Sequence, residues 1–274
     1  MKQITKALIM GGLEKNLIFE SPEFAFQTRP DNYRDYLVAS INHAEDYMFD
    51  AVPFPLRLYN QPADIEKALE SLSGITTEMG IGLVFSAPFT CSVREVGATK
   101  FFLEVRESLE LQNLLSLRTQ KSIDLLKRFE DFVDFAILID PMACNNLISS
   151  DYFKKFVFPS YNYLSQSTSL PIVIHTPGKI KKNLPYILES GIKGIQPIDS
   201  DELEDIIEGS NKRIQVMGNF NRKLLVYGDG EDIRLELERC RKAHNGYFIF
   251  HTNFWIPRRA NPKKVKYLSD LIKN

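Results

Sequence analysis

The sequence is poor in cysteine, and its three cysteines form no recognisable pattern. Cys91, Cys144 and Cys240 are odd in number, lie far apart and include no Cys-x-x-Cys pair. This arrangement argues against a disulfide framework and against a zinc ribbon. We therefore expect reduced cysteines and a cytoplasmic protein. Cys91 and Cys144 are predicted to face the same end of the fold, and Cys240 to be buried in a helix.

Long apolar runs and an excess of charge of either sign are also lacking. Nowhere do about 18 apolar residues follow one another, which argues against a membrane-spanning helix, and the N-terminal stretch has no cleavage-like site. With 34 Lys and Arg against 35 Asp and Glu, the net charge of -1 gives no overall attraction to nucleic acid or to an anionic membrane. We expect a small-molecule substrate, and neither nucleic acid nor membrane as a partner.

No linker, low-complexity tract or internal repeat interrupts the sequence, so we expect residues 1–274 to form one domain. A glycine-rich phosphate loop after a first strand is lacking too, which argues against an open doubly wound sheet. The composition, with 44% hydrophobic and 25% charged residues, is that of an ordinary globular protein with a sizeable core.

Eight apolar runs of strand length alternate with helical patterns. The expected strands are residues 16–20, 50–56, 80–86, 135–140, 172–175, 194–197, 213–219 and 246–251. The expected helices are residues 2–11, 31–48, 63–72, 100–129, 152–164, 182–190, 203–208, 231–242 and 262–272. This alternation, over this length of chain, predicts an α/β fold, a single (β/α)8 TIM barrel.

The run LPIVIHTPG, residues 170–178, is the clearest of the eight. Its β-branched residues between Pro171 and Pro177 are typical of a strand that is buried on both faces of a parallel sheet. His175 then lies at the carboxyl end of a strand, where ligands bind in parallel α/β folds. The alternative is a core histidine that is bonded to a backbone carbonyl.

Polar residues follow the other strands as well, including Asp199 just beyond the sixth. We predict catalytic roles for His175, His251, Asp140 and Asn219, and substrate binding by Arg57, Arg94, Glu20, Asn253 and Cys144. Because imidazole, carboxylate and thiolate all suit zinc, His175 is also a candidate metal ligand. Arg57 and Arg94, in the predicted loops after the second and third strands, could clamp anionic groups. Each of these residues could instead only cap a helix or lie in solvent.

The segment IDPMACNNLISSDYF, residues 139–153, resembles the uroporphyrinogen decarboxylase superfamily, which also contains cobamide-dependent methyltransferases. The further segments that agree are Phe158-Pro159, residues 171–178, Gly191, Gly218-Asn219, residues 6–12 and residues 85–90. The resemblance thus covers nearly the whole chain and implies a TIM barrel.

Within this superfamily the motifs are closer to the methyltransferase branch. The decarboxylases carry an Arg-Gln-Ala-Gly-Arg signature, which residues 1–60 lack. Their strand-two aspartate and third-loop tyrosine are replaced by Arg57 and Arg94. The spacing from Asp140 to Ser149 instead resembles enzymes that move a methyl group between a corrinoid and a thiol.

The resemblance also implies a zinc site, from which this sequence departs. The related methyltransferases bind zinc through His-x-Cys and a later cysteine. His175 matches the first ligand, but Pro177 stands at the second position and Asn253 or a neighbour at the third. Either the metal is absent, or it is held by a different set that includes His175 and His251.

The resemblance favours a methyltransferase that moves a methyl group between a corrinoid, or another methyl donor, and a thiol or similar acceptor. Zinc and a corrinoid are the candidate cofactors, and a corrinoid protein is the candidate partner. One alternative is a uroporphyrinogen-type decarboxylase of tetrapyrrole biosynthesis, in which Arg57 and Arg94 bind substrate carboxylates. The other is a catalytically silent barrel that binds a ligand or a partner protein.

Overall fold

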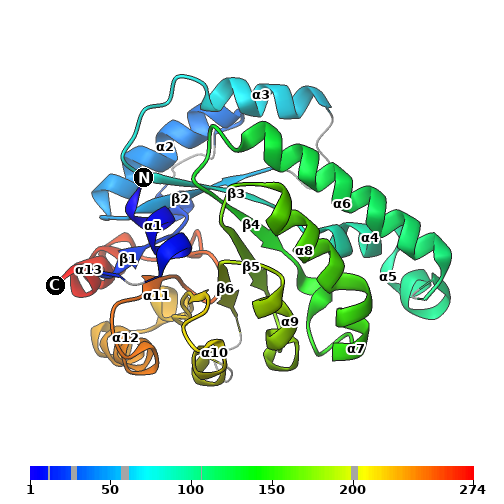
Figure 1. Cartoon of the computed structure of the whole chain (residues 1–274). Helices are drawn as coiled ribbons and strands as arrows, with labels where there is room; N and C mark the ends of the chain where they lie inside the picture. The colour runs from blue at the N-terminus through cyan, green and yellow to red at the C-terminus, as the bar shows by residue number, and fades with distance from the viewer. Residues whose placement is uncertain (12, 26–29, 57–61, 106, 199–202) are drawn as a thin grey trace.

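The computed structural model describes residues 1–11, 13–25, 30–56, 62–105, 107–198 and 203–274. Within them, parallel strands surround a central axis and helices cover the outside of the strands (Figure 1). The strands are β1 Leu17–Ile18, β2 Ala51–Pro55, β3 Gly80–Ser86, β4 Phe135–Ile139, β5 Ile172–Thr176, β6 Gly194–Pro197, β7 Gln215–Val216 and β8 Ile249–Phe250. Each lies within one residue of a predicted run, so the predicted TIM barrel is confirmed.

The ring of strands is closed by single bridges. Strands β2 to β7 form one continuous sheet in chain order, and β1 pairs with β8. Phe19 bridges to Ala51 and Met217 bridges to Ile249, which joins the two groups of strands on both sides. All pairs are parallel, so the carboxyl ends of the eight strands lie at one end of the barrel, called here the mouth.

Side chains along each strand point alternately into and out of the barrel, and this produces two apolar cores. Ile137 on β4 points into the barrel with Phe19, Val173 and Ile249, whereas its neighbour Leu138 packs in the larger core under the helices. Because successive side chains of a strand point to opposite faces, strands such as β3, β4 and β5 contribute to both cores. The continuous apolar runs of the sequence follow from this double burial.

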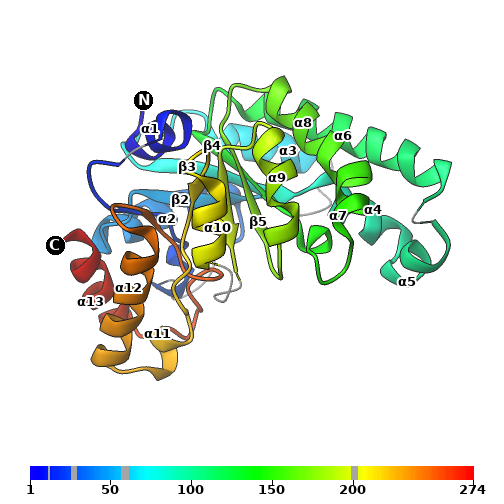
Figure 2. The ribbon, with the colours of Figure 1, turned by 60° about the horizontal axis from the view of Figure 1, so that its bottom comes forward.

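Helix α1, Gln3–Met10, seals the end opposite the mouth. Its Ile4 and Leu8 belong to the core inside the barrel. A Cβ atom on Gly80, the first residue of β3, would lie 2.7 Å from Ile4 Cγ2, so only glycine allows this close approach. Figure 2 shows α1 and α11 at opposite ends of the strands.

The other helices lie around the barrel. They are α2 Tyr33–Asp46, α3 Pro62–Leu72, α4 Pro88–Val96, α5 Ala98–Lys100, α6 Leu109–Phe129, α7 Ser150–Tyr152, α8 Phe158–Ser167, α9 Leu184–Glu189, α10 Leu203–Ser210, α11 Leu224–Tyr227, α12 Gly230–His244 and α13 Pro262–Lys273. Turns of 3-10 helix cover Pro22–Ala25, Pro141–Ala143 and Lys181–Asn183, and single π turns cover Phe101–Val105 and Phe153–Val157. No helix in the described ranges is long and apolar enough to cross a membrane.

The predicted helix over residues 100–129 was wrong at its beginning. The chain turns into α4 at Pro88, directly after β3, and α6 begins only at Leu109. Pro88 occupies the first turn of α4, where a missing N–H costs nothing. Ser108 caps α6 by accepting a hydrogen bond from the Leu111 N–H at 3.1 Å.

Candidate functional site

A cavity of about 350 Å³ opens at the mouth of the barrel. Its apolar walls come from the ends of β2, β3 and β4 and from the segment after β8. The apolar lining residues are Pro53, Pro55, Leu56, Val84, Phe85, Ile139, Phe254, Trp255 and Ile256. Ser21, Glu23, Tyr36, Ser86 and Arg94 add the polar groups. We call this cavity the mouth pocket.

Arg94 is the only cationic side chain among the described residues that line the mouth pocket. It lies on α4, not in a loop as predicted from the sequence. Its Nη1 donates a hydrogen bond to Ser86 Oγ at 3.3 Å, and no ion pair to it is found in the described part of the chain. Arg94 is exposed at the edge of this pocket, and its remaining guanidinium donors are suited to bind a carboxylate or sulfonate.

His175 lies at the end of β5 and is fully buried. The strand register places it directly opposite Gln196 on β6, and its Nδ1 lies 2.9 Å from Gln196 Oε1. Burial lowers the pKa of His175 to about 4, against the opposing effect of the Gln196 hydrogen bond. The imidazole is therefore uncharged at neutral pH.

His251 follows β8 and is also fully buried. Its Nδ1 lies 2.5 Å from the Thr252 carbonyl oxygen and 3.3 Å from Glu20 Oε1. Burial lowers the pKa of His251 to about 3 and raises the pKa of Glu20 to about 8. Both groups are thus uncharged at neutral pH, and the contact between them is not an ion pair.

Glu20 is predicted to bind substrate, but its carboxyl group is occupied by the protein. It accepts hydrogen bonds from the backbone N–H groups of Thr252 and Ile256, and its side chain is fully buried. Glu20 thereby fixes the segment after β8 to the end of β1. Glu20 is not among the residues that line the mouth pocket, so its predicted substrate binding stays a prediction.

Trp255 lies between the mouth pocket and the two histidines. Its ring is stacked on His175, with centroids 6.3 Å apart and planes 10° apart, and lies 4.7 Å from the ring of His251. Phe254 packs edge-on against His175 at 5.4 Å, and the guanidinium of Arg222 lies 4.6 Å above its ring. The indole therefore covers both imidazoles.

Asp140 ends β4 but lies on the helix side of the sheet. Thr90 Oγ1 donates a hydrogen bond to Asp140 Oδ1, and the hydroxyl of Tyr161 donates to Oδ2 at 2.8 Å. Burial raises the pKa of Asp140 to about 6. Because Ile139 lines the pocket, its neighbour Asp140 must point outward. The catalytic role expected for Asp140 stays a prediction; in this structure its carboxyl group ties α4 and α8 to β4.

Asn219 follows β7, is fully buried and is held from outside the barrel. Arg239 Nη2 on α12 donates to Asn219 Oδ1 at 3.0 Å and to its carbonyl oxygen at 2.9 Å. Asn253, predicted to bind substrate, accepts a hydrogen bond from the Arg222 N–H at 3.3 Å through Oδ1. Neither residue lines the mouth pocket.

The cysteines do not contribute to the mouth pocket. Cys144, predicted to bind substrate, is buried under the turn at Gly178, where an added Cβ would lie 3.0 Å from its Sγ. Cys91 lies on α4 and its Sγ contacts the Ser86 carbonyl oxygen at 3.5 Å. The prediction that Cys240 is buried in a helix is confirmed, and burial raises the pKa of its thiol to about 12.

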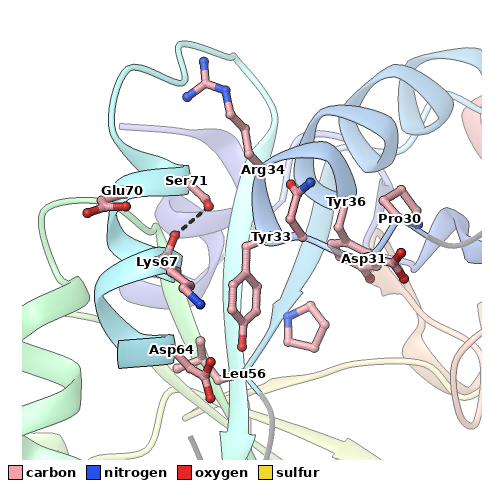
Figure 3. A pocket seen from close by; sticks show the side chains of 12 residues that line it. Pro30, Asp31, Tyr33, Arg34, Tyr36, Leu56, Asp64, Lys67, Glu70 and Ser71 are labelled. Carbon is pink, nitrogen blue, oxygen red and sulfur yellow. Dashed lines mark hydrogen bonds between the residues drawn. The ribbon is translucent and has the colours of Figure 1, made fainter. Parts of the chain in front are cut away.

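Two predicted rim residues, Arg57 and Asp199, lie outside the described residues. A second cleft, of about 720 Å³, lies between α2 and α3 and shares Tyr36, Pro55 and Leu56 with the mouth pocket. Figure 3 shows Tyr33 on α2 and Asp64 and Lys67 on α3 at this cleft. Its lining is far more charged than that of the mouth pocket.

The side chains present do not fit the zinc site that the resemblance implies. Among the residues that the structure describes, no group of three His, Cys, Asp or Glu side chains could hold a metal ion. Pro177 offers no side-chain donor, and the Asn253 oxygen is taken by Arg222. Zinc sites require three or four such ligands, so the donor set around His175 is too small to hold the ion.

The fold and the mouth pocket define a parallel β/α barrel with an apolar site at the carboxyl ends of its strands. The chain belongs to the uroporphyrinogen decarboxylase (URO-D) family, whose model matches residues 53–274.

Solved structures agree on the fold. A methyltransferase from Methanosarcina mazei superposes with a TM-score of 0.81 at 17% identity, over 98% of this chain and 96% of that chain. A protein from Listeria monocytogenes that is described as a vitamin-B12-independent methionine synthase has a TM-score of 0.56 at 10% identity, over 94% of this chain and 95% of that chain.

One curated relative matches a short segment. The methylated-thiol coenzyme M methyltransferase of Methanosarcina mazei is 42% identical over 55 residues, which is 20% of this chain. The match spans 15% of that relative's length.

Sequence reasoning missed Gln196 and Trp255. Gln196 is visible only through the register of β5 and β6, which pairs it with His175. Trp255 stands four residues after the end of the expected eighth strand, and only the fold of that segment brings it over the histidines. The sequence offered one signal for Trp255, which is the only tryptophan of the chain.

Proposed function

We propose that this protein is a methyltransferase that moves a methyl group between a corrinoid and a thiol at the mouth of the barrel. The observation that carries the proposal is the 42% identity over 55 residues to a methylated-thiol coenzyme M methyltransferase. The likeness of fold to a Methanosarcina methyltransferase over 98% of this chain supports it. In this proposal residues 1–274 act as one domain.

The mouth pocket binds the thiol acceptor. Its volume of about 350 Å³ suits a small molecule. Arg94 pairs with an anionic group of the acceptor, such as a carboxylate or sulfonate, because it is the pocket's only cation among the described residues. The apolar walls hold the rest of the acceptor.

His175 receives the thiol end of the acceptor. Its uncharged ring offers Nε2 as a hydrogen-bond acceptor, and this atom has no partner in the described part of the protein. Trp255 covers the ring, so the proposal requires the indole to turn aside when the acceptor enters. The proposed roles of His251 and Asn219 are to complete the wall around the thiol and to hold the β7 end in place.

The transfer itself needs no further group from the chain. The sulfur electron pair forms the new S–C bond, and the bond between cobalt and the methyl carbon breaks. Its electron pair stays with the corrinoid as Co(I), and the thiol proton passes to Nε2 of His175, which gives it up to solvent when the product leaves. The corrinoid is a substrate in this scheme, carried by a partner corrinoid protein that meets the mouth.

An anaerobic assay with methylcobalamin and coenzyme M tests the proposal. We expect the visible absorbance of methylcobalamin to fall at a rate proportional to the protein concentration, and only when the thiol is present. A rate equal to that without protein would contradict the proposal. If the protein then decarboxylates uroporphyrinogen, the decarboxylase alternative replaces it, and if it does neither, the silent barrel does.

A further inference from the structure

Gln196 is joined to His175 by the architecture of the sheet. In the parallel pairing of β5 with β6, these two residues are direct partners, so their side chains lie side by side on the same face. The Oε1 atom of Gln196 lies 2.9 Å from Nδ1 of His175, and both side chains are fully buried. Water cannot replace this contact.

The contact decides which ring nitrogen carries the hydrogen. An amide oxygen only accepts, so Nδ1 of the uncharged His175 ring must be the donor, and Nε2 keeps a bare lone pair. The tautomer of His251 is fixed in the same way, since its Nδ1 faces the Thr252 carbonyl oxygen at 2.5 Å. The two rings beside Trp255 thus both present an unprotonated Nε2.

Most of the buried polar atoms that lack a hydrogen-bond partner lie around His175. Five buried side-chain atoms lack a hydrogen-bond partner among the described residues, and three of them are His175 Nε2, His251 Nε2 and Gln196 Nε2. A buried polar atom without a partner costs about 1–3 kcal/mol. An apolar side chain at residue 196 would avoid one of these costs, so packing alone does not explain a glutamine there.

We propose that Gln196 is a positioning residue that holds His175 in the tautomer with a bare Nε2, ready to accept the hydrogen of the acceptor thiol. The step that Nε2 performs rests on the proposed methyl transfer, whereas the tautomer does not. The opposite orientation of the amide, with its NH2 group toward the ring, would place the hydrogen on Nε2 and remove the acceptor. The oxygen of Gln196 therefore determines whether Nε2 of His175 can accept the thiol hydrogen.

Nitrogen NMR of the protein labelled with ¹⁵N-histidine tests the tautomer directly. The chain has only four histidines, so single His→Asn variants assign every ring. In the wild type at pH 7.5 we expect the hydrogen of His175 on Nδ1. In Gln196→Met, which removes the acceptor oxygen at similar volume, the hydrogen should move at least partly to Nε2. The turnover number should fall about 10-fold to 100-fold.

Gln166→Met is the matched control, because Gln166 is exposed on α8. It should change neither the His175 signals nor turnover. If Gln196→Met does not fold, Gln196→Asn, whose shorter amide withdraws the oxygen from the ring, should give the same shift of hydrogen.

Two results would overturn the inference. One is a wild-type His175 with its hydrogen on Nε2, and the other is a folded Gln196 variant with an unchanged tautomer. A wild type that shows the expected tautomer but transfers no methyl group would refute the proposed function and leave the tautomer assignment standing.

Discussion

At the scale of single residues, the site depends on side chains that burial keeps uncharged. The pKa of His175 is lowered to about 4 and that of His251 to about 3, while the pKa of Glu20 is raised to about 8. Desolvation is the largest cause in all three cases. The only described cation that lines the mouth pocket is Arg94 on its wall.

The first prediction concerns His175. We expect His175→Ala to lower methyl transfer by about 100-fold or more, because it removes the acceptor for the thiol hydrogen. The same change leaves the Gln196 oxygen without its partner and should lower the free energy of unfolding by about 1–3 kcal/mol. At about 2–4 °C per kcal/mol, the thermal midpoint should then fall by a few degrees. Kinetics and calorimetry on the same sample separate the two effects. A stable and fully active variant would remove His175 from the site.

The second prediction concerns Arg94. We expect Arg94→Gln to raise KM for a sulfonate-bearing thiol about 10-fold to 100-fold, as for loss of a charged hydrogen bond of about 1.5–3 kcal/mol. The KM for a neutral thiol such as 2-mercaptoethanol should stay unchanged. Arg128→Gln, on α6 and paired with Glu66, is the matched control. An equal rise in KM for both thiols would show that Arg94 does not bind the anionic group.

Which strand-end residues reach the mouth could be predicted only in part from the sequence. His175 and His251 were found at strand ends, and each lies two residues after a strand residue that points into the barrel. Asp140 was misplaced because a shift of one residue along a strand reverses the face. Trp255 could not be found, since its position depends on the path of the chain after β8.

At the scale of elements, the strands were predictable and the helix boundaries less so. Most strands are short apolar runs with a proline or glycine near at least one end, and burial on both faces makes that pattern strong. Helix α4 was missed because Pro88 marks the end of β3 and at the same time occupies the first turn of α4. A proline at that place ends one element and begins another.

The third prediction concerns the attachment of α8 to β4. Tyr161→Phe removes the hydroxyl that donates to Asp140 Oδ2 at 2.8 Å and leaves a buried carboxyl oxygen without that partner. We expect a loss of about 1–3 kcal/mol in the free energy of unfolding. Tyr163→Phe on the same helix is the matched control, since Tyr163 is 60% exposed, and should cost less than about 0.5 kcal/mol. Equal urea midpoints for the two variants would contradict this attachment.

At the scale of the whole molecule, the barrel is filled with side chains at one end and open at the other. Helix α1 and the inner core close the amino end, and the mouth pocket lies above Trp255 and Ile139. Glu20 links the first and the last strand of the barrel, because its carboxyl group fixes the segment after β8 to the end of β1. Its buried carboxyl group makes the stability of the fold depend on pH.

The fourth prediction is this pH dependence. The pKa of Glu20 is 4.5 in the unfolded chain and about 8 when folded, so between these values the folded state holds one more proton. The contribution of Glu20 to stability must therefore fall as the pH rises through that window. Between pH 6.5 and 8 the loss from Glu20 is about 2 kcal/mol, at about 1.36 kcal/mol per pKa unit. The three buried histidines oppose this loss in part. The unfolded chain still holds some of their protons just above pH 6.5 and the folded state holds none, so together they add about 1 kcal/mol of stability over the same range.

Urea unfolding at pH 6.5 and pH 8 measures this loss. Glu20→Gln should remove the loss and leave the rise of about 1 kcal/mol that the histidines contribute, whereas Glu189→Gln on the exposed surface of α9 should keep the pH dependence of the wild type. The same decrease in Glu20→Gln as in the wild type would show that the carboxyl group of Glu20 is not the cause.

Transfer of a labelled methyl group tests the central claim most directly. The protein is incubated without oxygen with cobalamin that carries a trideuterated methyl group and with coenzyme M, and the thiol is analysed by mass spectrometry. We predict a thioether that contains all three deuterium atoms, formed in proportion to the amount of wild-type protein and about 100-fold more slowly with His175→Ala. Labelled thioether that forms equally fast without protein, or equally fast with His175→Ala, would contradict methyl transfer at the mouth of this barrel.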